Sequence, residues 1–177
     1  DPKRAYVNVD VGGLYRSDDG GHSWRMLHGN LPAHRGNYGV RGVWVHPTNP
    51  DHVVIATGGR WDGKQGVFVS TDAGNTWELT HSAWYWGNGP KRAAGSILVS
   101  DPRNPNRMYT APIQNGFAIS NDAGKTWQTN GQLKGVCPIA VWVDPVKTNN
   151  IWVACADRKV KLDGKDRAFQ TGFHFSS

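Results

Sequence analysis

An eight-residue pattern, Ser-x-Asp-x-Gly-x-Ser/Thr-Trp, occurs three times in this 177-residue chain and constrains its fold more than any other feature. The copies begin at Ser17, Ser70 and Ser120, so that successive starts lie 53 and 50 residues apart. A turn motif repeated at a period near 50 residues is typical of solenoids, arrays and propellers, in which each repeat is one supersecondary unit. The sequence therefore predicts a repeat architecture.

Each period contains short runs of β-branched and aromatic residues between Gly, Pro and Asn clusters, which is the pattern of β-strands and turns. The clearest period predicts four strands, over residues 40–45, 52–57, 66–70 and 77–79. The predicted fold is all-β: a partial β-propeller of four-stranded antiparallel blades, two complete and two incomplete. We expect one domain over residues 1–177, with a partial blade at 5–30, blades at 40–81 and 95–130, and a partial blade at 136–177.

Composition fits this prediction and limits the partners. The chain has 22 Gly and 9 Trp, and 19% of its residues are charged, which suits a β protein with many turns. No apolar run is long enough to span a membrane, so membrane insertion is not expected. The net charge is +6, but the charges are scattered apart from residues 158–167, which we interpret as a solvated loop. We expect no nucleic acid partner, no metal site and no other cofactor.

The last residues match the segments that precede two of the motifs. Residues 172–177 align with residues 66–71 and 116–121, and in both earlier copies the next residue is the motif Asp. We therefore expect the chain to be a fragment of a longer protein, inactive and poorly soluble alone. The remaining blades of the parent chain would cover the apolar faces and strand edges that a partial propeller exposes.

The repeated motif resembles the Asp box of sialidases, sortilin-type receptors, the photosystem assembly factor family and xyloglucan-degrading glycoside hydrolases. Its Asp can accept hydrogen bonds from the N–H groups of its own turn, its Gly can take a positive φ, and its Trp can pack on a neighbouring sheet. Because the motif recurs once per blade and a propeller has one active centre, we interpret it as structural. The residues concerned are Ser17, Asp19, Gly21 and Trp24; Ser70, Asp72, Gly74 and Trp77; and Ser120, Asp122, Gly124 and Trp127.

The order of strands in a meandering blade assigns each connection to one of two faces. The short Pro/Asn turns and the Asp boxes share the first face, whereas the longer and irregular segments share the second. Variable loops on a rigid scaffold commonly carry function. Five aromatic residues on these segments are candidates for a surface that stacks on sugar rings, although they could instead pack the loops onto the scaffold: Tyr38, Trp61, Trp84, Tyr85 and Trp86.

Residues 9–16 contain a candidate catalytic carboxylate. This segment resembles the Asp-x-Gly-Gly-x-Tyr-Arg segment of the xyloglucanase family of glycoside hydrolases. That resemblance implies two seven-bladed propellers facing across a cleft, one catalytic Asp from each, and hydrolysis of β-1,4-glucan backbones with inversion. It implies that Asp10 is the general base, with its partner Asp in the rest of the protein; Asp62 is a weaker local candidate for the acid. In the alternative interpretation Asp10 bonds the turn at Gly12 and Gly13.

Two further features leave alternatives open. The sialidase alternative is weakened because the chain has no Arg-Ile-Pro segment, and its arginines show no arrangement that marks a carboxylate clamp.

Cys137 and Cys155 lie on two predicted neighbouring strands at equal distance from residue 146, so we expect them to be cross-strand neighbours. A disulfide between them would fit a secreted protein, and two buried thiols are the alternative.

The sequence thus favours a carbohydrate-active propeller that binds and hydrolyses a polysaccharide or oligosaccharide, in a secreted or periplasmic bacterial protein. The alternative is a non-catalytic propeller that binds a protein, as in the sortilin or photosystem assembly families. Exposed aromatic rings beside two close carboxylates would favour the enzyme, whereas a face with charged groups only would favour the binding scaffold.

Overall fold

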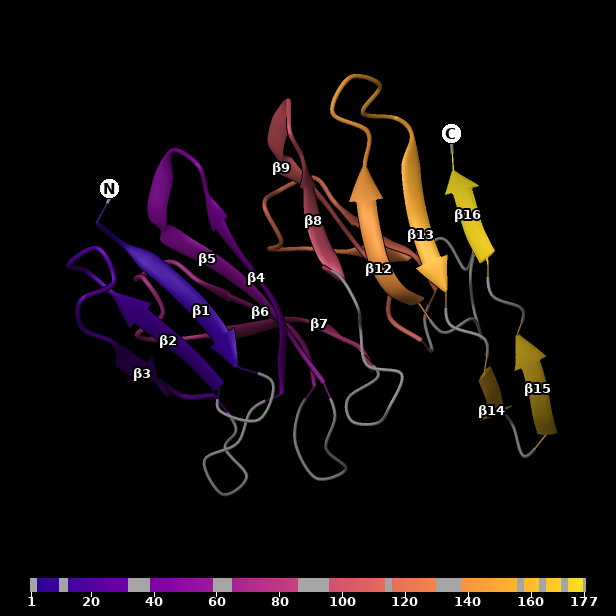
Figure 1. The fold of residues 1–177 in the computed structure, drawn as a ribbon, viewed down its shortest axis with the longest axis horizontal. Helices are drawn as coiled ribbons and strands as arrows, with labels where there is room; N and C mark the ends of the chain where they lie inside the picture. The colour runs from indigo at the N-terminus through magenta and orange to yellow at the C-terminus, as the bar shows by residue number, and fades with distance from the viewer. Residues whose placement is uncertain are drawn as a thin grey trace.

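The computed structural model describes residues 3–9, 13–31, 39–58, 65–85, 96–113, 116–129, 138–155, 158–162, 165–169 and 172–176. Every regular element in these ranges is a β-strand, and every strand pairing is antiparallel. Figure 1 shows the sheets following one another along the chain, from indigo at one side to yellow at the other. We number the four propeller sheets blade 1 to blade 4 in chain order.

Two blades have four strands each and two have three. Blade 1 contains β1 (Ala5–Val9), β2 (Gly13–Ser17) and β3 (Arg25–Leu27). Blade 2 contains β4 (Val40–His46), β5 (Asn49–Thr57), β6 (Gly66–Ser70) and β7 (Glu78–Ser82). Blade 3 contains β8 (Leu98–Asp101), β9 (Asn104–Thr110), β10 (Ala118–Ser120) and β11 (Gln128–Thr129), and blade 4 contains β12 (Pro138–Val143), β13 (Ile151–Cys155) and β16 (Gly172–Ser176). The prediction of an all-β partial propeller with two complete and two incomplete blades is confirmed.

The same register recurs in all four blades. In each blade a serine pairs with the preceding strand: Ser17 with Ala5, Ser70 with Val53, Ser120 with Met108 and Ser176 with Ile151. Equivalent positions can therefore be compared from blade to blade. Ser176 occupies in blade 4 the backbone position that the motif serines occupy in blades 1 to 3.

The core consists of three apolar layers, one between each pair of successive blades. β5 shows how one strand serves two layers, because successive side chains of a strand point to opposite faces. Val53 and Ile55 pack with Leu14 and Leu27 of blade 1, whereas Val54 packs with Met108 and Leu98 of blade 3. This double burial explains why the second half of β5 is an unbroken apolar run rather than an alternating one.

The outermost faces are apolar and exposed. On blade 1, Val7, Val9 and Trp24 are 44%, 41% and 42% exposed, and on blade 4 the cross-strand pair Trp142 and Trp152 is 53% and 37% exposed. Large exposed apolar side chains grouped on one face mark surfaces that bind another protein surface. The two ends of the row of blades are therefore suited to packing against another apolar surface.

Residues 158–167 do not form the predicted loop. They belong to a two-stranded sheet of β14 (Arg158–Leu162) and β15 (Lys165–Phe169), in which Leu162 pairs with Lys165. The sequence between the strands is Asp163-Gly164, a pair strongly favoured in two-residue hairpin connections. The prediction gave weight to the charges of the segment and missed this turn signal between two alternating runs.

Candidate functional site

Each repeated motif forms a closed hydrogen-bonded turn between two strands. In blade 2, Ser70 donates its hydroxyl to Asp72 (2.7 Å) and accepts the N–H of Gly74 (2.8 Å). Asp72 also accepts the N–H and the hydroxyl of Thr76, at 2.8 and 2.7 Å. The same bonds recur in the other two boxes, at Ser17, Asp19, Gly21 and Ser23 and at Ser120, Asp122, Gly124 and Thr126.

These hydrogen bonds fix the charge of the box carboxylates. Donation from the hydroxyl and N–H of Ser23 and from Ser17 lowers the pKa of Asp19 to about 2. Partial burial alone would raise the pKa of Asp72 and Asp122, but the bonds from the box Thr and Ser outweigh it and lower both. A general acid needs a raised pKa. The ionised, fully bonded box aspartates are therefore suited to holding a turn and unsuited to donating a proton.

The fourth residue of each box links the turn to the rest of its blade. It has a positive φ, of 76° at Gly20, 59° at Ala73 and 58° at Ala123. Its N–H donates to the carbonyl of Lys3, Asp51 and Asn106 respectively, at 2.8 to 2.9 Å. Each box is thereby tied to the beginning of the neighbouring strand: just before β1 in blade 1, and within the first three residues of β5 and β9 in blades 2 and 3.

The box Gly and Trp pack against the preceding blade. A β-carbon at Gly74 would lie 2.5 Å from Leu27 of blade 1, and the buried Trp77 belongs to the same apolar layer. In blade 3, Trp127 donates its indole N–H to Gly124 (2.9 Å) and lies 6.0 Å from the ring of His81 of blade 2. Trp24, in the first blade, is exposed instead. The geometry thus supports a structural role for the boxes.

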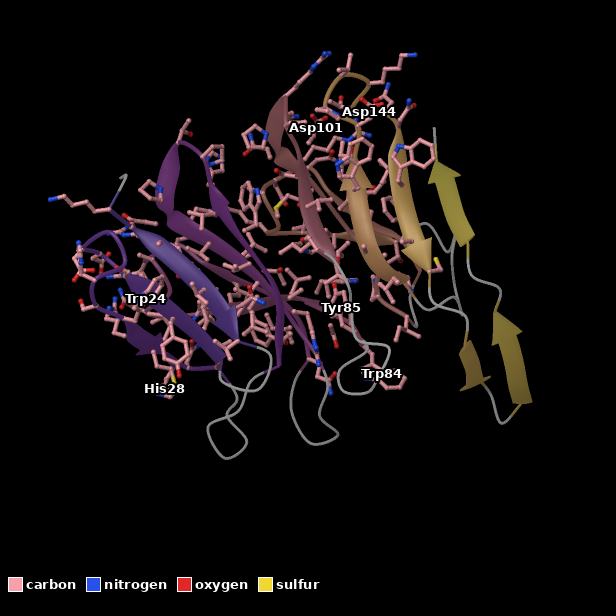
Figure 2. All side chains as sticks on the ribbon, viewed as in Figure 1. Trp24, His28, Trp84, Tyr85, Asp101 and Asp144 are labelled. Atoms are coloured by element: carbon pink, nitrogen blue, oxygen red, sulfur yellow. The ribbon has the colours of Figure 1, made fainter. Side chains whose placement is uncertain are left out.

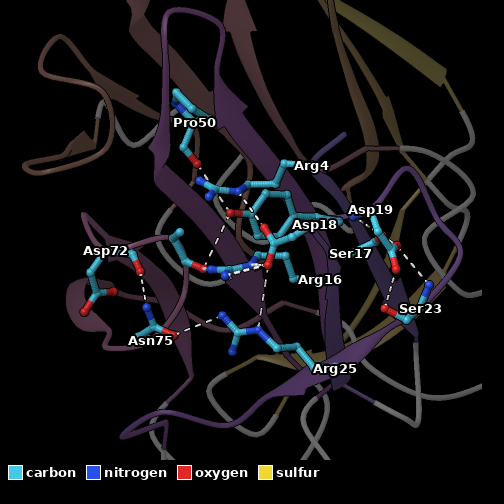
Figure 3. A network of polar contacts seen from close by, with 12 residues as sticks. Arg4, Arg16, Ser17, Asp18, Asp19, Ser23, Arg25, Pro50, Asp72 and Asn75 are labelled. Carbon is cyan, nitrogen blue, oxygen red and sulfur yellow. Dashed lines mark hydrogen bonds and ion pairs between the residues drawn. The ribbon is translucent and has the colours of Figure 1, made fainter. Parts of the chain in front are cut away.

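A polar network across blades 1 and 2 was not predicted from the sequence. Asp18 accepts hydrogen bonds from Arg4 (2.9 Å) and Arg16 (2.8 Å), and Arg25 lies 4.0 Å away (Figure 3). Each arginine also bonds blade 2, through Asp51, the Ala73 carbonyl and Asn75 respectively. Asp18 therefore holds three cations that join the two blades. Its signal in the sequence is weak, because Asp18 is a variable position of the box.

The second face is where the described ends of several segments meet. Asn8 donates its amide to the carbonyl of Val40 (3.2 Å), and Gly58 donates its N–H to the carbonyl of Gly39 (2.8 Å). A β-carbon at Gly58 would lie 2.6 Å from the carbonyl oxygen of Tyr85, so glycine is required for this approach. The described ends that flank residues 10–12, 32–38, 59–64 and 86–95 are thereby held close together.

Trp84 and Tyr85 differ in exposure, although both were predicted to line a sugar-binding surface. Tyr85 is only 2% exposed, and its hydroxyl lies 2.8 Å from that of Thr110, which donates to the Ile97 carbonyl. Burial raises the pKa of Tyr85 well above its ordinary value. Its ring therefore packs in the layer between blades 2 and 3, and the expectation of an exposed ring does not hold for Tyr85. Trp84 is partly exposed and lies toward the lower edge in Figure 2.

The opposite edge of the molecule carries the short turns. Figure 2 shows Asp101 and Asp144 at the upper edge, away from Trp84. Asp101 accepts the N–H of Arg103 (2.8 Å) and Asp144 accepts those of Val146 and Lys147 (2.8 Å each). These carboxylates hold turns, as the box aspartates do. The described turns of the first face are therefore regular, and the described ends that flank the longer segments lie on the second face.

Several predicted site residues lie outside the described residues, namely Asp10, Tyr38, Trp61, Asp62, Trp86 and Cys137. Cys155 is buried and pairs with Pro138, the residue after Cys137. In the described part of the chain, no three His, Cys, Asp or Glu side chains gather as a metal site. The same part contains no helix that could cross a membrane.

Comparison with known proteins agrees with this geometry. A family profile described as BNR/Asp-box repeat matches residues 118–129, the third box. The third box is thus matched as an Asp-box repeat, and the described strands form a partial β-propeller, as the sequence predicted.

Comparison with individual proteins gives a more specific similarity. The chain is 37% identical over 130 residues to a xyloglucanase of a Paenibacillus species, an alignment covering 69% of this chain and 13% of the relative. It is 36% identical over 133 residues to a xyloglucanase of Hypocrea jecorina, covering 70% of this chain and 16% of the relative. The GH74 enzyme of Niastella koreensis superposes with a TM-score of 0.70 at 26% identity, over 95% of this chain and 28% of that one. The predicted similarity to xyloglucanases is confirmed, and the chain spans less than a fifth of either curated relative named here.

Proposed function

We propose that the protein containing this chain is a glycoside hydrolase that cleaves the β-1,4-glucan backbone of xyloglucan-type polysaccharides. The observation that carries the proposal is the 37% identity to a xyloglucanase over 130 residues. The structural likeness to a GH74 enzyme over 95% of the chain supports it. A polysaccharide substrate also implies a secreted or periplasmic protein, since such polymers lie outside the cell.

In this proposal Asp10 is the general base. β1 ends at Val9 and β2 begins at Gly13, and these two residues pair, so the described ends on either side of residues 10–12 lie together. An inverting mechanism needs two carboxyl groups about 6.5–9.5 Å apart, with room for a water molecule between. Asp10 would take a proton from that water as its oxygen attacks the anomeric carbon. A second carboxylic acid would protonate the leaving glycosidic oxygen.

The second carboxyl group would come from the remaining blades of the protein, with Asp62 as the local alternative. The sequence assigns both Asp10 and Asp62 to connections predicted on the second face. By contrast, the box aspartates are ionised and bonded within their own turns. The general acid must carry a proton at the working pH. A box aspartate would be a poor acid, so the proposal assigns the chemistry to the second face.

Aromatic side chains would bind the sugar rings beside these carboxylates. Trp84 is partly exposed, and the backbone next to it is fixed because Trp84 accepts the N–H of Ile113 (2.9 Å) and Tyr85 is buried. Gly39, Gly58 and Tyr85 lie close together, because Gly58 bonds Gly39 and approaches the backbone of Tyr85. In the sequence these three residues directly adjoin the segments that carry Tyr38, Trp61 and Trp86. This convergence supports one continuous aromatic surface for a glucan chain.

The test measures release of reducing ends from xyloglucan and other β-glucans by the intact parent protein. The variants are Asp10→Asn, Asp62→Asn and, as a matched carboxylate on the opposite face, Asp144→Asn. We expect a loss of about 10²–10⁴-fold in kcat for Asp10→Asn, the usual contribution of a general base, and near-normal activity for Asp144→Asn.

Full activity of Asp10→Asn would reject its role as the base. A loss confined to Asp62→Asn would move the catalytic carboxylate to that loop. A folded parent protein without activity on any glucan would reject the hydrolase and favour the protein-binding propeller.

A further inference from the structure

The carbonyl of the fourth box residue joins each box to the blade before it. Ala73, in the box of blade 2, accepts a hydrogen bond from Arg16 of blade 1 at 2.6 Å. Ala123, in the box of blade 3, accepts one from the His52 ring of blade 2 at 2.7 Å. The hydroxyl of Tyr6 also reaches blade 2, at 3.3 Å from the Pro50 carbonyl and 3.5 Å from that of Ala73. Donors on one blade thus meet box carbonyls on the next.

The joint between blades 3 and 4 has the donors without the acceptor. Arg107 directly precedes Met108, which pairs with a box serine, just as His52 precedes Val53. Tyr109 follows Met108 in the same way that Tyr6 follows the residue paired with Ser17. Of these two positions, the one of Tyr6 reaches a box carbonyl at the first joint and the one of His52 does so at the second, and blade 3 carries a donor at both.

Each of the two side chains has a buried donor atom that has no partner among the described residues. Tyr109 is completely buried, and in the described part of the chain its hydroxyl has no hydrogen-bond partner. The Nε atom of Arg107 is also buried and likewise without a partner there, and its guanidinium lies 5.6 Å from the centre of the Tyr109 ring. An unpaired buried polar group loses its hydrogen bonds to water without replacement, and native proteins rarely leave one unpaired without a reason.

Blade 4 has the strand from which a box would continue. β16 pairs with β13 so that Ser176 lies opposite Ile151, which is the register of Ser70, Ser120 and Ser17 in the other blades. In blades 2 and 3 the third residue after the serine is the one whose carbonyl faces the preceding blade. An Asp-box turn continuing β16 would bring the corresponding carbonyl to the joint between blades 3 and 4.

We infer that Arg107 and Tyr109 form a receiving site for a fourth Asp-box turn, which continues β16 in the same polypeptide and accepts their hydrogen bonds through its fourth-position carbonyl. The site is independent of any catalytic role. It makes the polar link across this joint equivalent to those of the two joints before it.

The experiment compares the 177-residue chain with the same chain extended after Ser177 by a copy of residues 122–129. Thermal unfolding is followed for both chains with and without Tyr109→Phe. We expect the extension to raise the Tm. We expect Tyr109→Phe to lower the Tm of the extended chain by about 2–4 °C, since one hydrogen bond is lost. In the unextended chain the same substitution leaves the Tm unchanged or raises it, because it removes an unpaired hydroxyl.

Three controls make the outcome decisive. Arg107→Met tests the second donor and should show the same dependence on the extension, whereas Tyr15→Phe should shift both chains equally. An extension with the same residues in reversed order should not stabilise. Equal effects of Tyr109→Phe in both chains would overturn the inference, as would a loss of stability in the unextended chain, which would mean that water or a second copy already pairs the hydroxyl. An extension that does not raise the Tm would overturn it too.

Discussion

Gly74→Ala is the substitution whose cost can be worked most directly from the structure. Gly74 has a φ of 87°, and a β-carbon there would lie 2.5 Å from Leu27 Cδ1 and 3.2 Å from the ring of Trp77. Holding a non-glycine residue in a sparsely populated conformation costs about 1–3 kcal/mol. Inserting a carbon into a packed layer costs about 1–3 kcal/mol more. We therefore expect the free energy of unfolding to fall by about 2–6 kcal/mol.

The first box provides the matched control. Gly21 has a similar φ of 94°, but a β-carbon there would meet only Trp24, at an ordinary contact distance of 3.7 Å. Gly21→Ala should therefore carry the backbone cost without the packing cost. Urea unfolding followed by tryptophan fluorescence measures both losses, and unchanged m-values would show that the unfolded states are comparable. Equal losses for the two variants would refute the claim that the box glycine is required by the approach of the preceding blade.

Three further predictions concern single groups. Burial lowers the pKa of His52 in the folded state despite its bond to Ala123, so the unfolded state binds the proton more readily. The free energy of unfolding should therefore fall as the pH drops below about 6.5, and it should fall less steeply in His52→Gln. Equal pH slopes of the two proteins in urea titrations would contradict this. Asp18→Asn should lower the free energy of unfolding by about 0.5–1 kcal/mol at low salt and by less in 0.5 M NaCl, because the ion pairs of Asp18 are partly exposed. A loss that does not depend on salt would contradict a contribution of these ion pairs. Tyr85→Phe should cost about 1 kcal/mol by urea unfolding through the lost bond to Thr110, and no loss would show that this bond does not stabilise the layer.

The blade architecture could be predicted because its signal is periodic and local. The box residues determine their own turn through bonds to residues two and four positions away, as between Asp72 and Thr76, and the strands around them are short apolar runs between Pro, Asn and Gly. β14 and β15 were missed because a single Asp-Gly turn signal was outweighed by the charges around it.

The contacts between blades could not be predicted, since they join residues far apart in the sequence, 25 positions for Tyr85 and Thr110 and 57 for Arg16 and Ala73. Asp18 and Tyr85 illustrate this. Asp18 is a variable box position, and it contacts three arginines of blade 1 that also bond residues of blade 2. Tyr85 stands between two other aromatic residues in the sequence, and only the position of Thr110 in the next blade shows that its ring packs inward. Periodicity assigns strands and faces, but it does not identify which polar pairs meet across a joint.

The most direct test of the proposed function follows the anomeric protons by NMR while the intact parent protein digests a xyloglucan oligosaccharide. An inverting hydrolase acting on β-1,4 bonds releases the α-anomer first, and Asp10→Asn should nearly abolish the signal. Initial release of the β-anomer would contradict the inverting mechanism and the role of Asp10 as base. The absence of any new anomeric signal from the folded parent protein would contradict the hydrolase itself.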